Sequence, residues 1–268
     1  MRIIRFLDDN GQIRFGHDHR DGEATLLTGD IFEAPQDTGH RQKVAKLLAP
    51  LQPAAILCIG LNYTQHARET KAELPQYPVL FMKNPAALNH PGDPIVLPPS
   101  CMEPPQVDFE VELAIVIGRA AKNVSAANAL DYVFGYTIGN DVSARRWQKH
   151  GGGGQWVRGK SFDTFCPLGP ELVTADLVPD PQQLRLQCFL NGTLMQDANT
   201  ADMIFSVAEL IEYLSNGMTL LPGTVIMSGT PSGVGFARKP PIFLKPGDTL
   251  ELKIENLGTL YNPVAAAY

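Results

Sequence analysis

Three carboxylates at alternate positions constrain this chain more than any other feature. In Val107-Asp108-Phe109-Glu110-Val111-Glu112-Leu113 every second residue is acidic, and Ala114-Ile115-Val116-Ile117 follows directly. Alternation predicts a strand on which Asp108, Glu110 and Glu112 share one face. The apolar continuation indicates a buried sheet, where unpaired negative charge is costly. A divalent cation such as Mg²⁺, which takes oxygen ligands, would offset that cost. A solvated acidic face on an amphipathic strand explains the alternation equally well.

The rest of the chain predicts short strands separated by turns. Gly and Pro account for 24 and 22 of the 268 residues. We expect one hairpin around the turn Asn10-Gly11 and another across residues 248–264. The clearest helix covers residues 206–216, where Ser206 and Glu209 form a capping box.

Two further helices are expected, at residues 125–131 and at residues 40–48, the second ended by Pro50. We place a small N-terminal β region at residues 1–52 and a larger, catalytic domain at residues 53–268. Few helices and many short strands favour a β-dominated α+β fold over a Rossmann or TIM-barrel layout.

Charge and composition exclude several classes of protein. A net charge of −6 and a pI near 5.5 argue against a nucleic-acid partner. No apolar run is long enough to span a bilayer, and the N-terminus lacks the apolar core of a signal peptide. We therefore expect a soluble, cytoplasmic protein without a membrane partner. The four cysteines show no metal-type spacing.

Asp141 follows the strand predicted at residues 133–138. It precedes Val142-Ser143-Ala144-Arg145, where we expect a helix to start. An aspartate in that place is usually an N-cap, and the spacing alone favours that role. The alternative is a third metal ligand that converges on Glu110 and Glu112.

Residues 154–161 fit the P-loop pattern G-x-x-x-x-G-K-[ST]. A P-loop needs an apolar strand before it and a helix after it. Here a glycine run precedes the pattern, and Pro167 and Pro170 follow it closely. We therefore do not expect nucleotide binding. Lys160 remains a cation that can meet an anionic substrate, although an isolated lysine is usually a surface residue.

His66 and Glu69 stand three residues apart. On a helix they would share one face and could act as a base with its orienting carboxylate. A surface pair without a role is the commoner outcome of this spacing. Position favours function, because the pair follows an apolar strand that ends at Gly60, and loops at such places often carry function.

In their order along the chain, these segments resemble the fumarylacetoacetate hydrolase family. The resemblance rests on residues 59–69, 107–113, 135–145, 158–163 and 222–231, and it covers residues 55–265. Residues 162–170 and 243–248 are most similar to the domain-containing protein 2 branch of the family.

The resemblance implies a mixed β-sandwich roll and a homodimer. It also implies a Mg²⁺ or Mn²⁺ site on Glu110, Glu112 and Asp141, in place of the N-cap role of Asp141. The founding hydrolases have a fourth carboxylate ligand where this chain offers Asn62, which argues against hydrolysis of fumarylacetoacetate itself.

The same resemblance assigns roles to residues around the metal. Arg145, Gln148 and Lys160 would contact substrate oxygens, and Thr230 would line the pocket. His66 and Glu69 would lie on a mobile lid that carries the catalytic base.

A small 2-oxo acid suits such a site as substrate. Its carboxylate and 2-oxo oxygens could chelate the metal, which would stabilise an enolate. Lys160 and Arg145 would add positive charge at the developing oxyanion. His66 could then activate water to split a C–C bond, assist release of CO₂, or move a proton between carbon and oxygen.

These reactions give three hypotheses. We expect first a hydrolase of acylpyruvate-type substrates or a decarboxylase of oxaloacetate. The second hypothesis is a keto–enol tautomerase of oxaloacetate that uses the same site. The third is a binding protein without catalytic activity.

Overall fold

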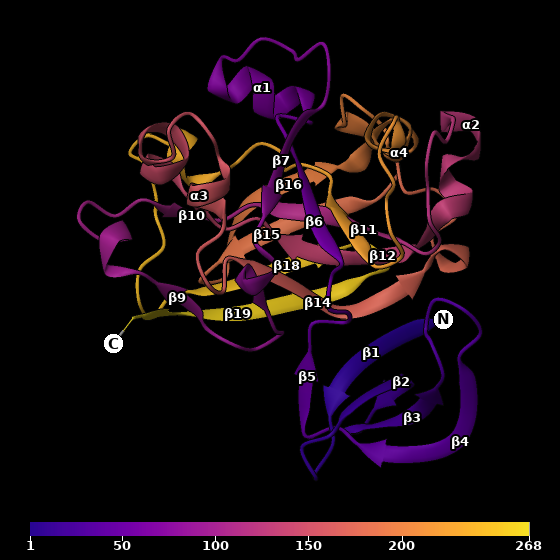
Figure 1. Ribbon diagram of the computed structural model, residues 1–268. Helices are drawn as coiled ribbons and strands as arrows, with labels where there is room; N and C mark the ends of the chain where they lie inside the picture. Colours follow the sequence, from indigo (N-terminus) through magenta and orange to yellow (C-terminus); the bar gives the residue numbers. More distant parts are fainter. Residues whose placement is uncertain (268) are drawn as a thin grey trace.

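The computed structural model describes residues 1–267 and shows a strand-dominated fold (Figure 1). Most strands belong to one mixed sheet of 12 strands or to a second sheet of five strands. This architecture confirms the predicted β-dominated α+β class. Among the described residues, no helix is long and apolar enough to cross a membrane.

The N-terminal strands form a unit at one end of the molecule, at the bottom of Figure 1. They are β1 (Arg2–Leu7), β2 (Ile13–Arg20), β3 (Glu23–Thr28), β4 (Gln36–Lys43) and β5 (Lys46–Leu48). β1 to β4 pair in chain order, and β1 and β2 form the predicted hairpin around Asn10-Gly11. Ile4, Phe6 and Ala24 make a small core of this unit. The domain boundary after residue 52 stays a prediction.

The helix expected at residues 40–48 is wrong. β4 and β5 occupy this segment, with Thr25 of β3 opposite Arg41 and Arg5 of β1 opposite Leu48. The segment contains good helix formers, but pairing with two neighbouring strands overrides a weak local propensity.

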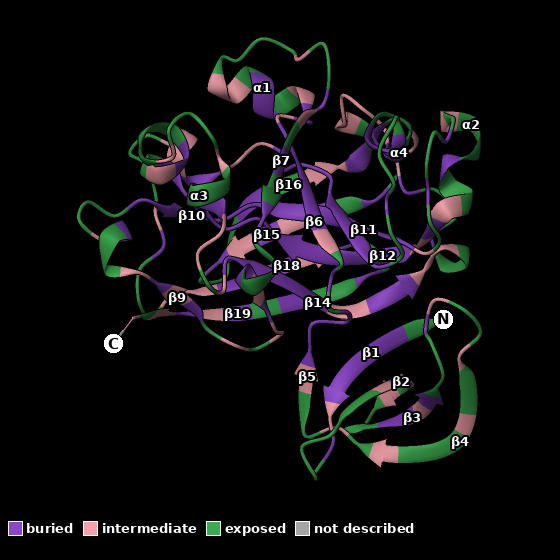
Figure 2. Cartoon of the chain, viewed as in Figure 1, coloured by how far each residue is buried: buried purple, intermediate pink, exposed green. Residues whose placement is uncertain are grey.

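The large sheet continues from the N-terminal unit through the pairing of β1 with β14. Its remaining strands are β14 (Cys166–Thr174), β12 (Val133–Asn140), β11 (Val111–Ile117), β17 (Thr224–Met227), β6 (Ala55–Gly60), β7 (Val79–Lys83) and the short β8 (Leu88–Asn89) beside β14. β11 is buried on both faces (Figure 2). Leu113 and Ile115 pack in one core, whereas Ala114 and Val116 pack in another.

The second sheet covers one face of the first. Across it lie β16 (Thr193–Asn199), β15 (Arg185–Leu190), β18 (Thr249–Ile254), β19 (Gly258–Ala266) and β9 (Ile95–Leu97). Leu186 and Leu252 join Leu113 and Ile115 in the larger core. β18 and β19 form the hairpin predicted near the C-terminus.

Within residues 1–267, four short α-helices lie at the edges of the sheets. They are α1 (Thr64–Thr70), α2 (Ala126–Ala129), α3 (Val157–Lys160) and α4 (Val207–Ser215). A π-helical turn covers Trp147–Gly151, and 3₁₀ turns cover Pro85–Ala87, Pro99–Cys101, Leu130–Tyr132, Ala175–Leu177, Thr200–Asp202 and Gly235–Ala237. The predicted helix at 206–216 and its capping box are confirmed. α2 and the turn after it occupy the segment predicted as helical at 125–131.

The alternation of carboxylates predicted one continuous strand. In the structure this strand is interrupted at Phe109 and Glu110. β10 (Val107–Asp108) pairs with β13 (Ser143–Ala144) as a separate ladder, and β11 begins at Val111. Side chains bridge the break, since Asn140 Oδ1 accepts from the Glu110 N–H and Gln196 Oε1 from the Val111 N–H, each at 3.0 Å. The helical turn expected from Val142 onward begins only at Arg145, because β13 occupies Ser143 and Ala144.

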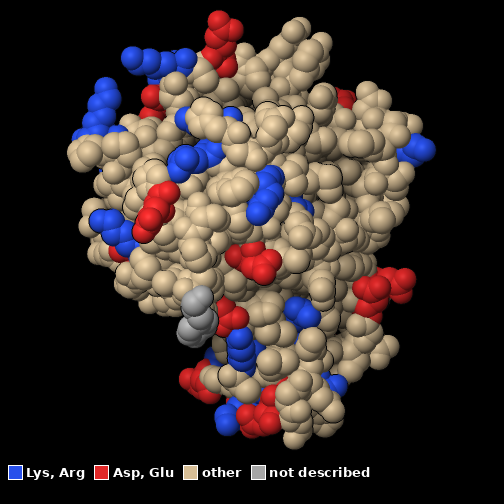
Figure 3. Space-filling model, turned by 60° about the vertical axis from the view of Figure 1, so that its left-hand side comes forward, with Lys and Arg blue, Asp and Glu red and all other residues tan. Residues whose placement is uncertain are grey.

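The surface carries charges of both signs. On the face that Figure 3 shows, basic and acidic side chains are interspersed and are dense on the N-terminal unit. In this unit, Arg41 Nη1 lies 3.2 Å from Asp18 Oδ2, and Arg41 Nε lies 3.5 Å from Glu23 Oε2. Such exposed pairs stabilise the fold only weakly.

The capping box gives a prediction for stability. Ser206→Ala should lower the free energy of unfolding by about 1 kcal/mol, because the Glu209 N–H at the start of α4 loses its side-chain acceptor. Urea denaturation measures the change. Ser125→Ala is the matched control, since Ser125 occupies the N-cap of α2 without accepting a capping hydrogen bond. Equal losses in the two variants would contradict the prediction.

Candidate active site

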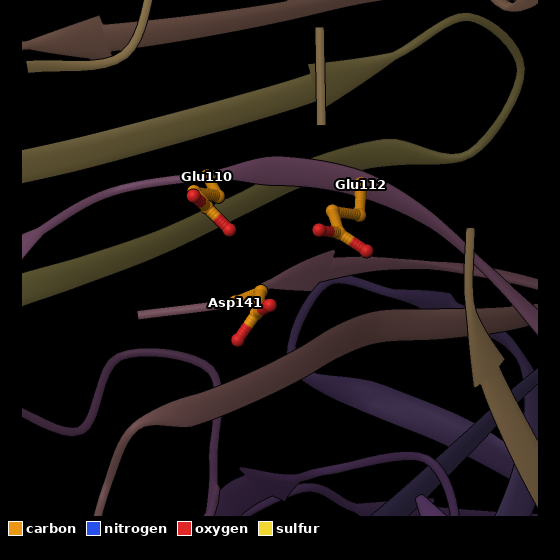
Figure 4. A group of neighbouring side chains, drawn as sticks. All are labelled: Glu110, Glu112 and Asp141. Atoms are coloured by element: carbon orange, nitrogen blue, oxygen red, sulfur yellow. The ribbon is translucent and has the colours of Figure 1, made fainter. Parts of the chain in front are cut away.

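The pairing of β11 with β12 brings three carboxylates together. Val111 lies opposite Asn140 and Glu112 opposite Gly139, so the same register places Glu110 opposite Asp141. The Asp141 N–H donates to the Glu110 carbonyl at 3.0 Å. Glu112 is two residues along the same strand face. Figure 4 shows Glu110 and Glu112 on one segment, with Asp141 facing them from the next.

These three side chains can hold a divalent cation. One oxygen from each lies within 4.8 Å of the others, and all three residues are buried. Asp141 Oδ1 accepts no hydrogen bond from residues 1–267. Glu112 Oε2 accepts from the Gly229 N–H at 2.9 Å, but Glu112 forms no ion pair within the described residues. An oxygen-rich cluster with uncommitted acceptors suits a hard ion such as Mg²⁺ or Mn²⁺.

Two buried cations compensate Glu110 and Asp141. Lys160 Nζ lies 2.7 Å from both Glu110 Oε2 and Asp141 Oδ2. Arg145 Nη2 lies 2.6 Å from Glu110 Oε1. The Arg145 guanidinium also donates twice to Asp108 Oδ2, at 2.9 and 2.8 Å. Asp108 therefore binds and orients Arg145 and is not part of the carboxylate group that could hold a metal.

Lys83 is a third buried cation, and the sequence analysis missed it. Its Nζ lies 2.6 Å from Asp141 Oδ1, but its three protons go to the carbonyls of Val142, Lys160 and Phe165. The contact with Asp141 is thus an ion pair without a hydrogen bond. Inward Phe81 and outward Met82 precede Lys83 on β7, and this alternation was the signal that could have found it.

The pKa values separate the two glutamates. Burial alone would raise the pKa of Glu110, but Arg145 and Lys160 lower it to about 2. Burial, with Asp141 and Glu110 nearby, raises the pKa of Glu112 well above its usual value. Burial opposes the charge of Lys160, yet Asp141 and Glu110 raise its pKa. Glu112 is therefore the carboxylate that still lacks a positive partner.

α1 carries the histidine predicted as a base. His66 Nδ1 lies 3.2 Å from Glu69 Oε2, and both Glu69 oxygens accept from the Gly233 N–H, at 2.9 and 3.1 Å. No hydrogen bond joins His66 Nε2 to the described residues, so this nitrogen is free for proton transfer. His66 is only 7% exposed and meets the Phe236 ring edge to face.

A cavity of about 290 Å³ joins these groups. The predicted site residues that line it are His66, Glu110, Glu112, Asp141, Arg145, Gln148, Lys160 and Thr230. Glu69 lies behind His66 instead. Gln148 Oε1 accepts from Arg145 at 3.1 Å, which leaves the Gln148 amide N–H groups for a ligand. The Thr230 hydroxyl donates to the Val111 carbonyl and accepts from Gln196, so its remaining contribution is to the wall.

Asn62 has a structural role. Its side chain donates to the carbonyls of Phe205 and Ser228 and accepts from the Phe205 N–H, so its polar atoms are committed to backbone. It packs under Gly229, whose φ of +99° and close approach exclude a side chain. This packing presents the Gly229 N–H to Glu112.

Buried charged groups that compensate one another around a cavity are typical of the active site of an enzyme. The family described as "Fumarylacetoacetate (FAA) hydrolase C-terminal" matches residues 55–265, and that described as "Rv2993c-like, N-terminal" matches residues 1–50. The chain belongs to the fumarylacetoacetate hydrolase family, as the sequence resemblance predicted.

Several relatives are similar over most of the chain. "Oxaloacetate tautomerase FAHD2B, mitochondrial" of Bos taurus is 47% identical, over 91% of this chain and 77% of its own length. A "Fumarylacetoacetate hydrolase domain-containing protein 2 homolog" of Dictyostelium discoideum is 49% identical, over 82% and 74%. The crystal structure titled 5-carboxymethyl-2-hydroxymuconate delta-isomerase, from Mycobacterium smegmatis, matches with a TM-score of 0.86 at 41% identity, over 100% of both chains.

The unpaired state of Glu112 leads to a prediction for the metal-free protein. In EDTA, the Glu112→Gln variant should have a higher melting temperature than the wild type, because the neutral amide removes the cost of a buried charge. A raised pKa means that this cost is present at high pH and vanishes as the pH falls and wild-type Glu112 becomes protonated. The difference between variant and wild type should therefore shrink toward acid pH in thermal denaturation. Added Mg²⁺ should stabilise the wild type alone.

Glu110→Gln is the matched control, with the opposite expectation. It leaves Arg145 and Lys160 without a shared buried partner and should cost about 3–5 kcal/mol. A loss of stability in both variants would show that Glu112 is compensated in the metal-free protein.

Proposed function

We propose that this chain is a divalent-cation-dependent enzyme of small 2-oxo acids and that it interconverts the keto and enol forms of oxaloacetate. The observation that carries the proposal is a carboxylate-held histidine in the same cavity as a compensated carboxylate triad. Moving one proton between carbon and oxygen needs such a base beside a site that tolerates negative charge. Relatives named oxaloacetate tautomerase, at 45–47% identity, support this choice among the reactions that the site allows.

The cavity floor would bind and polarise the 2-oxo acid. Gln148 offers amide N–H groups to the carboxylate, and Lys160 and Arg145 hold positive charge where the 2-oxo oxygen becomes an oxyanion. A cation held by Glu110, Glu112 and Asp141 would supply Lewis-acid stabilisation of the same oxygen.

His66 would handle the proton at carbon. Its Nδ1 faces Glu69, which fixes the ring orientation and stabilises the imidazolium that forms when Nε2 accepts a proton. Glu69 is itself held by the Gly233 N–H, so the pair is oriented before substrate arrives. His66 can then return the proton to the oxygen or to carbon, which completes the exchange.

Hydrolysis of an acylpyruvate-type C–C bond, or decarboxylation of oxaloacetate, is the second candidate. The same His66–Glu69 pair favours either reaction, since a histidine held in this way can deprotonate water for hydrolysis, or protonate the enolate that remains when CO₂ leaves. A structure titled fumarylacetoacetate hydrolase, from Exiguobacterium antarcticum, matches with a TM-score of 0.84 at 36% identity, over 100% of both chains.

A proton NMR time course separates the candidates. Metal-stripped protein with added Mg²⁺ receives oxaloacetate or acetylpyruvate, and Mg²⁺ without protein is the control. Tautomerisation predicts faster keto–enol exchange of oxaloacetate and no pyruvate above the control. Pyruvate above the control from either substrate would instead establish cleavage or decarboxylation.

His66→Ala should lower kcat for the keto–enol exchange by about 10²–10⁴-fold, because the proton-transfer group is lost. Glu69→Gln should cost less, since the ring is retained and only its orientation and charge stabilisation suffer. His150→Ala is the control, because His150 is exposed and lies outside the cavity. Unchanged turnover in the His66 variant would remove this residue from the mechanism.

Two further proposals concern the protein in solution. We propose a homodimer, on the family resemblance, and light scattering on the purified chain tests it. We also propose a cytoplasmic location, which fractionation of the source cells tests.

A further inference from the structure

Three cationic side chains line the cavity, and they differ in their partners. Arg145 and Lys160 are buried against Asp108, Glu110 and Asp141. Lys149 is exposed and forms neither an ion pair nor a side-chain hydrogen bond with residues 1–267. We propose that Lys149 is the binding subsite for the second carboxylate of a dicarboxylate substrate. The inference rests on the proposed function for the identity of the first carboxylate's site.

The fold explains why Lys149 reaches the cavity. Arg145, Gln148 and Lys149 occupy positions i, i+3 and i+4 of the helical turn after β13, so they share one face. The turn widens into a π-helix at Trp147–Gly151, a feature that often marks functional sites. Arg146, on the same turn, lines a different surface hollow with Trp147.

The Phe236 ring contacts both Lys149 and Arg145. Lys149 Nζ lies 4.6 Å from the centroid of the Phe236 ring, and Arg145 Cζ lies 4.3 Å from the same centroid. The two cations are thus neighbours across one aromatic wall of the cavity. An exposed cation–π contact contributes only about 0.5–1 kcal/mol, so a carboxylate can readily displace it.

The net charge of the cavity supports this role for Lys149. With Glu112 ionised, as it would be beside a divalent cation, the four buried carboxylates exceed the buried cations Lys83, Arg145 and Lys160 by one negative charge. A divalent cation and a monoanionic 2-oxo acid bring this sum to zero. A dicarboxylate adds one more negative charge, and Lys149 is the cavity cation still available to neutralise it.

The other residues of the cavity wall would not stabilise a second carboxylate. Ile59, Phe81 and Trp156 give the wall an apolar surface, and a carboxylate desolvated against such groups is costly. The subsite at Lys149 therefore distinguishes a four-carbon dicarboxylate from a 2-oxo acid with an apolar tail.

Binding of unreactive ligands tests the subsite separately from catalysis. Malate and lactate share a 2-hydroxy acid head and differ in the second carboxylate. In calorimetry with Mg²⁺ present, Lys149→Met should weaken malate binding about 10- to 100-fold, which corresponds to loss of a charged hydrogen bond. Lactate binding should stay unchanged. Lys149→Arg should restore most of the malate affinity, and Arg146→Met, which removes a charge from the same turn, should leave both ligands unaffected.

The outcomes keep this inference apart from the proposed function. Equal affinities of wild type and Lys149→Met for malate would overturn the subsite, even if oxaloacetate is tautomerised. Selective loss of malate binding would establish the subsite, even if tautomerisation is absent. With active protein, the variant should raise KM for oxaloacetate with little change in kcat, because this contact is equally strong in the ground and transition states.

Discussion

The structure depends on keeping negative charge buried between two paired strands. The register of β11 against β12 puts Glu110 opposite Asp141, with Glu112 beside them, inside a sheet that is covered on both faces. Such a cluster is tolerable only with close counter-charges and hydrogen bonds. Lys160 and Arg145 meet this need for Glu110, and the Gly229 N–H meets part of it for Glu112. The remaining deficit at Glu112 is what a divalent cation would fill.

The cations also organise the backbone around the cluster. The Lys83 ammonium donates to the carbonyls of Val142, Lys160 and Phe165, which lie before β13, at the end of α3 and before β14. Asp108 plays the corresponding role as an acceptor. Its carboxylate binds the guanidinium of Arg145 and accepts hydrogen bonds from the N–H groups of Gly235 and Phe236. One buried charge thus fixes several chain segments at once, and the positions of the substrate-facing groups follow from these few contacts.

The sequence predicted what local patterns encode and missed what distant contacts decide. The capping box at Ser206 and the strand after residue 132 follow from short-range spacing, and the structure has both. The segment at residues 40–48 became two strands because partners far along the chain were available to pair with it. Lys83 was missed for a related reason. The alternation on β7 points its side chain inward, but the backbone carbonyls that bind its ammonium come from segments far along the chain.

The buried charged groups and His66 come from different parts of the fold. This separation explains why the residues around the cavity are compatible with more than one reaction. The buried charged groups of the cavity come from β11, from residues next to β11 and β12, and from α3. In the proposed function, their charges would stabilise any enolate-like species of a 2-oxo acid. The proposed proton carrier, His66, comes from α1, a helix of seven residues whose N-cap, Tyr63, offers no side-chain cap. The links from Glu69 to Gly233 and from the Gln65 N–H to Asp202 hold α1 over the cavity. On the proposed function, changes in α1, or at the cavity mouth near Lys149, would redirect the chemistry without disturbing the buried charge that the fold requires.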